Sequence, residues 1–507
     1  MSSPVKLARD DLGASHSDLI GGAESLRFRP RRLTSEDLRF DLSCQFILDG
    51  VSIGPIAIVD ISPTGVALEP SSRLDLLPGR LVDDLKIDYR DSRVWEGQAK
   101  AVYNVEGPPA RAGLQFTSNL FDLQLLYLSD NVIETLLAAH LEQDRRAVET
   151  LPVDWRAAVA RIRQMLLSAR DVLRESEAML SKDPDARARE ERALIERIFE
   201  KWKGPFHEQL SQLHAQSRAF DEDVATVARG YAGRELLSLV YPCPIHSRAF
   251  EKPLGYAGDY KLMLLLMTDV LEGEGIFGRF LHFLTQNYTL GRAVRSREKT
   301  LLIAASQTVT SLDRPVRIMS LACGPALELQ RLIREIGPIA HPVELILVDQ
   351  DEETMRYCNE ELNRALLSRP RDGEALSLNC LHLSILQVLS PKDRKEREFV
   401  SSNLRDIDLI YSAGLYDYLP QPLTARLTRR LYSMLAPGGR LFIGNLRDCA
   451  DSSWMMEYVS AWILEYREPE QMLSLARGLK PEPSSSEIVY DDTGYCMFLK
   501  VVRPAES

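Results

Sequence analysis

Hydrophobic and polar positions change their spacing twice along the chain, and each change marks a new kind of element. Between residues 26 and 128, short apolar runs follow one another closely, and turn residues such as Asp49-Gly50 separate them. Several short strands at close spacing predict a small β-barrel or sandwich. The expected strands are Cys44–Leu48, Pro55–Asp60, Gly65–Leu68, Leu81–Tyr89 and Gln98–Val105.

From about Asp130 to Thr310, apolar residues recur every three or four positions with charged residues between them, as in the run that begins at Trp155. This spacing is typical of amphipathic helices. The segment Lys182–Arg197 is rich in Arg, Glu and Ala, and mixed charges at this density favour a solvated helix face over a binding surface.

Beyond Pro315 the apolar runs become continuous, and helical patterns separate them, which predicts buried parallel strands in a doubly wound α/β sheet. These runs are Val316–Leu321, Val343–Val348, Ile407–Tyr411 and Arg440–Ile443. A last strand, Tyr495–Val502, follows a turn sequence that predicts a closing hairpin. We therefore expect a multidomain α+β and α/β chain, with a flexible tail (1–25), a β-barrel (26–128), a helical lid or homodimer arm (129–300) and a doubly wound domain (301–507).

Charge and cysteine usage narrow the functional classes. The 507 residues carry 62 Lys and Arg against 73 Asp and Glu, a net charge of −11, which argues against nucleic-acid binding by the overall field. No stretch approaches the roughly 18–20 uncharged apolar residues of a membrane helix, and no export signal is visible at the N-terminus. The 7 cysteines are widely spaced without a CxxC pair, which argues against a disulfide framework and a structural zinc site and favours a reducing cytoplasm.

The stretch with the most chemical information is the strand, turn and helix around Gly324. In an open α/β sheet, ligands bind beyond the carboxyl ends of the strands, and a side chain at Gly324 would block their close approach. Asp349, 25 residues further on at the tip of the next strand, can accept both hydroxyls of a ribose. A single glycine, where a dinucleotide fingerprint needs three, suits a nucleoside without a pyrophosphate. The alternative is that Gly324-Pro325 only turns the chain.

Four motifs in order resemble those of class I S-adenosylmethionine (SAM)-dependent methyltransferases, over about residues 300–507: Ala322-Cys-Gly-Pro-Ala-Leu-Glu328, Val348-Asp-Gln-Asp351, Asp408–Leu419 and Leu435–Ile443. The resemblance implies a Rossmann-like domain with SAM as its cofactor. It places Ala322, Cys323 and Gly324 at the methionine end, Asp349 on the ribose, Gln350 beside the adenine, Ser384 and Ile385 at the ring, and Ser412, Ala413 and Gly414 beneath the sulfonium. Ser384 departs from the acid that many relatives carry there.

A narrower resemblance comes from Lys252-Pro-Leu-Gly-Tyr-Ala-Gly-Asp-Tyr260, together with Ala293–Arg297 and the segments Gly444–Arg447 and Trp462–Arg467. These are similar to a bacterial family of fatty-acid carboxyl methyltransferases whose namesake product is 3-hydroxypalmitic acid methyl ester. The resemblance implies methyl transfer to the carboxylate of a small or fatty acid. Because that carboxylate is already ionised at neutral pH, the enzyme needs alignment rather than a general base.

Candidates to orient the substrate carboxylate are Tyr256, Tyr260, Tyr416, Arg467, Arg248 and His246. Asp259 is a candidate partner for the cofactor's ammonium or for a neighbouring tyrosine. Each has a structural alternative: Gly255–Tyr260 as a helix-entry turn with core tyrosines, Trp462 and Tyr466 as packing residues of one amphipathic helix, and His246 as a satisfied structural histidine.

Two rival functions remain open at this stage. One is a regulatory binder that senses SAM or a cyclic dinucleotide without turnover. The other is an N-methyltransferase for a small amine, which would need a base such as Asp259 or His246.

The barrel segment carries its own candidate site. The pattern Asp60-x-Ser62-x-x-Gly65, with Arg27-x-x-x-Arg31 ahead of it, resembles a PilZ domain, a small β-barrel that binds cyclic di-GMP. The resemblance implies that these five residues hold the nucleotide, with paired guanidiniums on phosphate and guanine edges. The alternatives are that Arg32 or Arg39 fills the arginine position, or that a degenerate barrel only docks against the enzyme.

Overall fold

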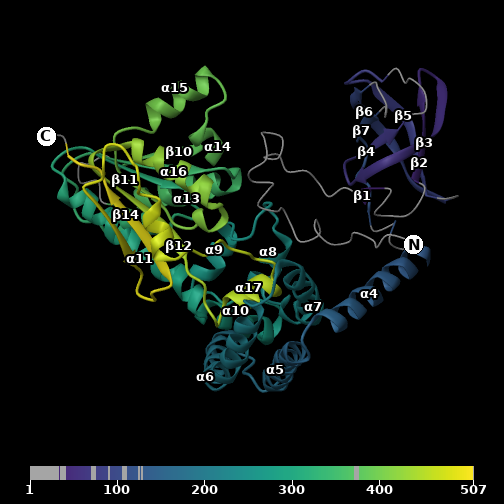
Figure 1. The fold of residues 1–507 in the computed structure, drawn as a ribbon, viewed down its shortest axis with the longest axis horizontal. Coiled ribbons are helices and arrows are strands. Elements are labelled where there is room, and N and C mark those ends of the chain that lie inside the picture. The colour runs from purple at the N-terminus through teal and green to yellow at the C-terminus, as the bar shows by residue number, and fades with distance from the viewer. Residues whose placement is uncertain are drawn as a thin grey trace. The chain divides into compact units, whose positions relative to one another are not determined.

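The computed structural model describes residues 33–34, 42–69, 76–89, 92–105, 111–123, 126, 130–369 and 376–505. The chain divides into two compact units, one ending at Glu149 and the other beginning at Thr150 (Figure 1). The tail expected over residues 1–25 lies outside the described residues, as do Arg27 and Arg31.

The first unit is built on a closed antiparallel β-barrel. The strands are β1 (Leu33–Thr34), β2 (Leu42–Leu48), β3 (Val51–Ser62), β4 (Gly65–Glu69), β5 (Leu81–Tyr89), β6 (Ser92–Val105) and β7 (Arg111–Phe116). They pair in the order β3-β2-β5-β6-β7-β4, and β4 pairs back onto β3, which closes the barrel. Along β2, buried and half-buried residues alternate, as expected for a strand with one face inside a barrel. The predicted barrel is confirmed, although the sequence analysis did not predict β7.

Helices link the barrel to the C-terminal sheet and begin the second unit. They are α4 (Asp130–Thr150), α5 (Val153–Glu177), α6 (Pro184–Ser217), α7 (Glu222–Val240), α8 (Pro244–Glu251), α9 (Tyr260–Met267), α10 (Gly275–Asn287) and α11 (Thr289–Ser311). The buried residues of α5, among them Trp155 and Ile162, recur at helical spacing. The indole N–H groups of Trp155 and Trp454 both donate to Ser217, at 2.9 and 3.1 Å, so distant segments share one core.

The rest of the second unit alternates strands and helices around one sheet. The elements are β8 (Val316–Leu321), α12 (Leu327–Glu335), β9 (Val343–Asp349), α13 (Glu352–Leu367), β10 (Leu376–His382), α14 (Ile385–Leu389), α15 (Arg394–Asn403), β11 (Ile407–Ser412), η1 (Tyr416–Tyr418), α16 (Gln421–Ser433), β12 (Leu435–Leu446), α17 (Ser453–Tyr458), α18 (Pro469–Ser474), β13 (Ser485–Tyr490) and β14 (Cys496–Val502). The sheet order is β10-β9-β8-β11-β12-β14-β13, parallel except for β14. The winding direction reverses between β8 and β11, so the predicted doubly wound fold is confirmed and its switch point lies there.

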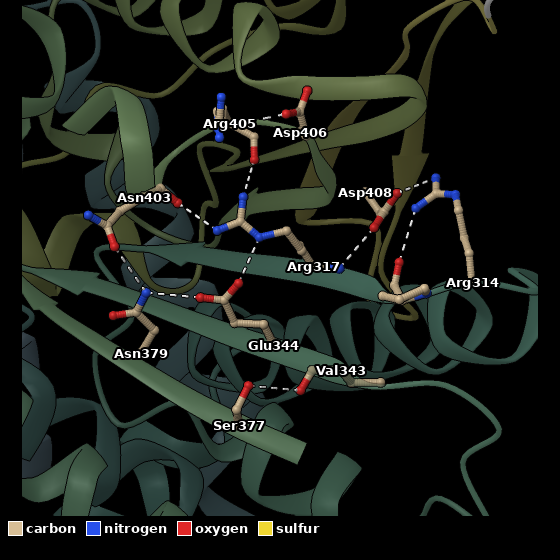
Figure 2. A network of polar contacts seen from close by, with 11 residues as sticks. Arg314, Arg317, Val343, Glu344, Ser377, Asn379, Asn403, Arg405, Asp406 and Asp408 are labelled. Carbon is tan, nitrogen blue, oxygen red and sulfur yellow. Dashed lines mark hydrogen bonds and ion pairs between the residues drawn. The ribbon is translucent and has the colours of Figure 1, made fainter. Parts of the chain in front are cut away.

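A polar network ties the strands together near their amino ends (Figure 2). Arg317 of β8 donates through Nε to Glu344 of β9 at 2.7 Å, and Asn379 of β10 donates to the same carboxylate at 2.9 Å. Asp408 of β11 accepts from the Arg317 backbone N–H at 2.8 Å and from Arg314 at 2.6 Å. Each of these bonds joins neighbouring segments of the sheet, so the network fixes the strands against one another.

The segment that follows α17 corrects one prediction. Trp462 and Tyr466 do not lie on an amphipathic helix, because residues 461–468 form no helix. Ala461 has a positive φ of 50°, and the backbone of Glu465 bonds to other elements, donating to Asp417 O at 2.7 Å and accepting from the Asn445 side chain at 3.0 Å. Tertiary partners for the backbone therefore override the helix-like spacing of the aromatic residues.

Candidate functional site

The turn that follows β8 leaves backbone facing open space at the switch point. Ala322, Gly324 and Ala326 all have positive φ angles, of 50°, 53° and 48°. Apart from Gly324 and its two chain neighbours, no described residue has an atom within 4 Å of the position where a Cβ on Gly324 would stand. Two alanines in the left-handed region are uncommon, and such strain concentrates at binding sites. The predicted strand, turn and helix are confirmed, with α12 beginning at Leu327.

Asp349 ends β9 beside this turn. Its carboxylate accepts from the backbone N–H of Gly324 at 3.2 Å and from that of Asp351 at 3.1 Å. The residue is 6% exposed, and burial raises the pKa of its carboxyl to about 6. Cys323 lies beside it, with its Sγ 4.0 Å from an Asp349 carboxylate oxygen. The structure thus brings the glycine turn and the strand-tip carboxylate together.

The next loops along the same edge carry Gln350, Ser384 and Ile385. The backbone carbonyl of Gln350 bonds to His382 Nε2 at 2.8 Å. Ser384 caps α14, accepting from the backbone N–H of Gln387 at 3.3 Å, and Ile385 is buried in the first turn of that helix. Leu383 N–H donates to Asp349 O at 3.0 Å, so the loops after β9 and β10 are held side by side.

The loop after β11 contributes Ser412, Ala413 and Gly414. Ser412 is fully buried, and its hydroxyl has no hydrogen-bond partner among the residues that the structure describes. Gly414 lies against Arg297 of α11, since a Cβ on this glycine would stand 3.0 Å from Arg297 Nη1. The sequence analysis gave Arg297 no role. The sequence does contain a signal for it. Leu290, Val294 and Arg297 are spaced four and three residues apart, so the arginine lies on the same helix face as two apolar residues.

The segment Gly255–Tyr260 enters helix α9 and borders this edge. Asp259 is 1% exposed and caps the helix through Oδ1, which accepts from Leu262 N–H at 2.9 Å and from Arg248 Nε at 2.7 Å. Its other carboxylate oxygen, Oδ2, is buried and has no partner in the described part of the chain. Gly255–Tyr260 is therefore a helix-entry turn, as the structural alternative predicts. One carboxylate oxygen of Asp259 nevertheless has no partner among the described residues.

The two tyrosines of that segment face the tip of β9 and the start of α13. Tyr256 donates its hydroxyl to Asp351, and burial together with Asp349 and Asp351 raises its pKa well above the ordinary value. Tyr260 is buried, and its hydroxyl reaches Glu353 at 3.4 Å. Tyr256 thus stands close to the carboxylate that we expected to hold a ribose.

Tyr416 and Arg467 are both buried and bonded to other protein groups. Tyr416 is fully buried in the hydrophobic core, and its hydroxyl bonds to Thr428 at 3.1 Å. Arg467 donates to Tyr416 O at 2.7 Å, to Asn445 Oδ1 at 2.6 Å, to Gln421 Oε1 at 2.8 Å and to Leu419 O. These internal bonds argue against the substrate contacts expected of both residues.

His246 is held by two hydroxyls. The Thr285 hydroxyl donates to Leu281 O at 2.8 Å, so it accepts from His246 Nε2, 3.1 Å away, and Nδ1 is left to accept from Ser460 at 2.7 Å. Burial lowers the pKa of this histidine to about 4. Neutral and with both ring nitrogens bonded, His246 matches the structural alternative and offers no free lone pair for a base.

An apolar cavity lies among α8, α9, α10, α11 and α17, in the group of helices that Figure 1 shows beside the sheet. Its lining includes Ile245, Leu266, Val294, Leu446, Met455 and Trp462. Trp462 also reaches the Gly255–Tyr260 segment, since its ring would lie 3.3 Å from a Cβ on Gly258. One wall of the cavity therefore lies beside the Gly255–Tyr260 segment, which carries Asp259.

The barrel places the described part of its candidate site in the turn between β3 and β4. Ser62 is buried, and its hydroxyl donates to Gly65 O at 3.2 Å and accepts from Thr64 N–H at 3.3 Å. Gly65 passes so close to Leu114 of β7 that a Cβ would collide with its carbonyl. Asp60 is half-buried in β3 and pairs with Thr34 of β1. Ser62 thus stabilises the turn itself, and Gly65 allows the close approach of β7.

Nowhere in the described ranges do three or more His, Cys, Asp or Glu side chains gather as a metal ion would require. Their helices are likewise too short or too polar for any to cross a membrane. All 7 cysteines are free thiols.

No protein-family model matches the chain, and no curated protein matches it. Among solved structures, a possible exported protein from Bordetella parapertussis aligns with 64% of this chain and 100% of its own, at 17% identity and a TM-score of 0.37. Magnesium protoporphyrin IX methyltransferase from Synechocystis, with bound SAM, aligns over 43% and 84%, at 10% identity and 0.30. The N-methyltransferase NodS from Bradyrhizobium japonicum, with S-adenosylhomocysteine, aligns over 42% and 87%, at 17% identity and 0.27.

Proposed function

We propose that this chain is a SAM-dependent methyltransferase that methylates the carboxylate of a small or fatty acid. The observation that carries the proposal is the open space in front of Gly324, bordered by the Asp349 carboxylate at the switch point of the sheet. Ligands of open α/β sheets bind at this place. The motifs found in the sequence add which ligand is expected there.

The residues at this edge offer SAM both open space and polar groups. A buried polar atom without a partner normally signals a missing ligand or water, and Ser412 Oγ and Asp259 Oδ2 are two such atoms near this edge. Asp349 would hold the ribose hydroxyls, and Gln350, Ser384 and Ile385 would border the adenine. Ala322–Gly324 and Ser412–Gly414 would enclose the methionine part, with Asp259 as the partner of its ammonium.

When bound, SAM supplies a methyl group on a sulfonium, which a carboxylate can attack in line. The protein then has to align the two reactants and exclude water, and it needs no base because the carboxylate is already charged. The helix-entry turn Gly255–Tyr260 borders the site on one side, and the apolar cavity extends from it. An apolar cavity suits the hydrocarbon part of an acid.

The two rival functions have different support. His246 carries a bonded, neutral ring, so an amine substrate would depend on Asp259, whose Oδ2 is unpaired. A non-catalytic sensor would use the same cofactor site without a second substrate, and the apolar cavity is a feature that such a sensor does not require.

The barrel is proposed to bind cyclic di-GMP and to regulate the enzyme. The supporting observation is the pairing of β1 with β3, Leu33 with Ile61 and Thr34 with Asp60. Leu33 and Thr34, the first described residues after Arg31, therefore run beside the strand that carries Asp60 and Ser62. Binding that is lost in Arg27→Ala and Arg31→Ala would support this role, and no binding to the intact protein would leave the barrel as a scaffold.

Product formation tests the main proposal. Purified protein is incubated with saturating SAM and a panel of carboxylic acids and amines, and S-adenosylhomocysteine and methylated products are measured across pH. We expect methyl esters at a rate that does not fall sharply as the pH drops towards 6. A rate that falls below the pKa of a base, with an N-methylated product, would support the amine alternative. SAM binding without any product would support the sensor.

A further inference from the structure

Arg297 of α11 is a buried cation with weak protein contacts. The residue is 8% exposed. Its Nη1 donates to Ala413 O at 3.4 Å, and its Nη2 lies 3.2 Å from Met263 Sδ. The first bond is long, and a thioether is a weak acceptor. Within the described part of the chain, Arg297 forms no ion pair.

Arg467, which is also buried, has much stronger contacts than Arg297. Arg467 is 4% exposed and donates to four protein oxygens. A buried guanidinium without such partners costs several kcal/mol. Glu328 and Asp417 are two carboxyl groups that interact electrostatically with Arg297, and burial raises the pKa of each to about 7. Near neutral pH their compensating charge is therefore incomplete.

Arg297 stands between the apolar cavity and the switch point. On the sheet side, its guanidinium lies against Gly414, which follows β11. On the other side, Val294 lines the cavity one helical turn before Arg297. Helix α9 repeats the arrangement, because Leu266 lines the cavity and Met263, one turn earlier, contacts Arg297. Two helices thus lead from the apolar cavity to the same cation.

We propose that Arg297 receives a carboxylate at the point where the apolar cavity meets the carboxyl edge of the sheet. This assignment rests on the proposed function. The planar guanidinium matches a carboxylate through paired N–H bonds. Two carboxylates belong to the proposed reaction, the amino-acid carboxylate of SAM and that of an apolar acid whose chain fills the cavity.

Two ligand pairs, each differing in one carboxylate, test the assignment and distinguish its sources. Calorimetry compares SAM with decarboxylated SAM, and decanoate with 1-decanol in the presence of S-adenosylhomocysteine. In the wild type we expect the carboxylate ligand of at least one pair to bind about tenfold more tightly, as a charge-assisted bond supplies. In Arg297→Met that preference should disappear, and Arg297→Lys should retain part of it. The pair that loses its preference identifies the source.

Stability measurements separate ligand binding from a structural role. Without ligand, Arg297→Met should unfold at the wild-type temperature or above it, whereas the matched variant Arg467→Met should unfold well below it. If every preference seen in the wild type survives in Arg297→Met, or if the wild type has no preference in either pair, the assignment is overturned. If wild-type protein binds no SAM at all, it is the proposed function that fails.

Discussion

The two edges of the C-terminal sheet use polar residues in opposite ways. At the amino edge, Arg317, Glu344 and Asp408 bond to one another's strands, and the network in Figure 2 leaves their charges paired. At the carboxyl edge and the helices beside it, Ser412 Oγ and Asp259 Oδ2 are buried without partners. Since unpaired buried groups cost stability, we infer that this edge keeps them for a ligand. The comparison separates residues that are bonded within the fold from residues that are proposed to bind a ligand.

Carboxyl groups at the two edges have their pKa values shifted in opposite directions. Burial would raise the pKa of Glu344, but hydrogen bonds from Arg317 and Asn379 hold it below its ordinary value. Asp349 and Glu328 lie near the open edge, where burial raises their pKa values to about 6 and about 7. Bonding thus outweighs burial at one edge, and burial outweighs bonding at the other.

The largest expected effect is at the amino edge. Asp408 is 2% exposed in its side chain and accepts from the Arg317 backbone and from Arg314, so Asp408→Ala leaves a buried N–H without a partner. We expect it to lower the free energy of unfolding by about 3 kcal/mol. Urea unfolding measures this loss. The comparison variant Arg314→Ala removes the half-exposed cation but leaves Asp408 bonded to the Arg317 backbone N–H, so it should cost less, about 1.5 kcal/mol. Equal losses in the two variants would break the comparison.

At the carboxyl edge, a substitution is expected to have a smaller effect, and to weaken cofactor binding rather than stability. Ser412→Ala removes a hydroxyl that has no protein partner, so the unfolding temperature should stay the same or rise. If this hydroxyl bonds the cofactor, the Kd for SAM should increase about tenfold, the value of one hydrogen bond. Thermal unfolding and calorimetry on the same sample give both numbers. A loss of stability with unchanged affinity would place Ser412 with the structural residues instead.

The smallest effect is a pH dependence. The carboxyl of Glu328 has an ordinary pKa of 4.5 and a folded pKa of about 7. Its raised value means that folding favours the protonated form, so its contribution to stability is complete below pH 4.5 and is lost as the pH rises through 7. Relative to the wild type, Glu328→Gln should therefore gain stability with rising pH, on the order of 1 kcal/mol between pH 6 and 7. A constant difference across that range would contradict this shift.

Much of the fold follows from the sequence because it depends on local pattern. Continuous apolar runs located β8 and β9, and the spacing from Gly324 to Asp349 located the turn and strand tip that the structure brings together. Strand β7 was missed because Gly113 interrupts a short run that follows a Gly-Pro-Pro loop. Local pattern thus predicts an element only when the run is long enough to show its period.

The roles of single polar residues depended on tertiary partners that no pattern reveals. Tyr416 and Arg467 looked available in the sequence, yet both are bonded inside the core. Trp462 and Tyr466 have helical spacing, but the backbone between them bonds to Asp417 and Asn445. The opposite holds for Arg297, since the lack of a strong partner is visible only once its neighbours are placed.

The central claim is that the open edge at Gly324 and Asp349 binds SAM. The most direct measurement is calorimetric titration of the wild type, Asp349→Ala and Glu344→Gln with SAM, after circular dichroism shows that each is folded. We expect saturable binding in the wild type and Glu344→Gln, and none, or binding at least about a hundredfold weaker, in Asp349→Ala, because the ribose loses a charged acceptor. No heat in folded wild-type protein, or equal affinity in Asp349→Ala, would contradict the account.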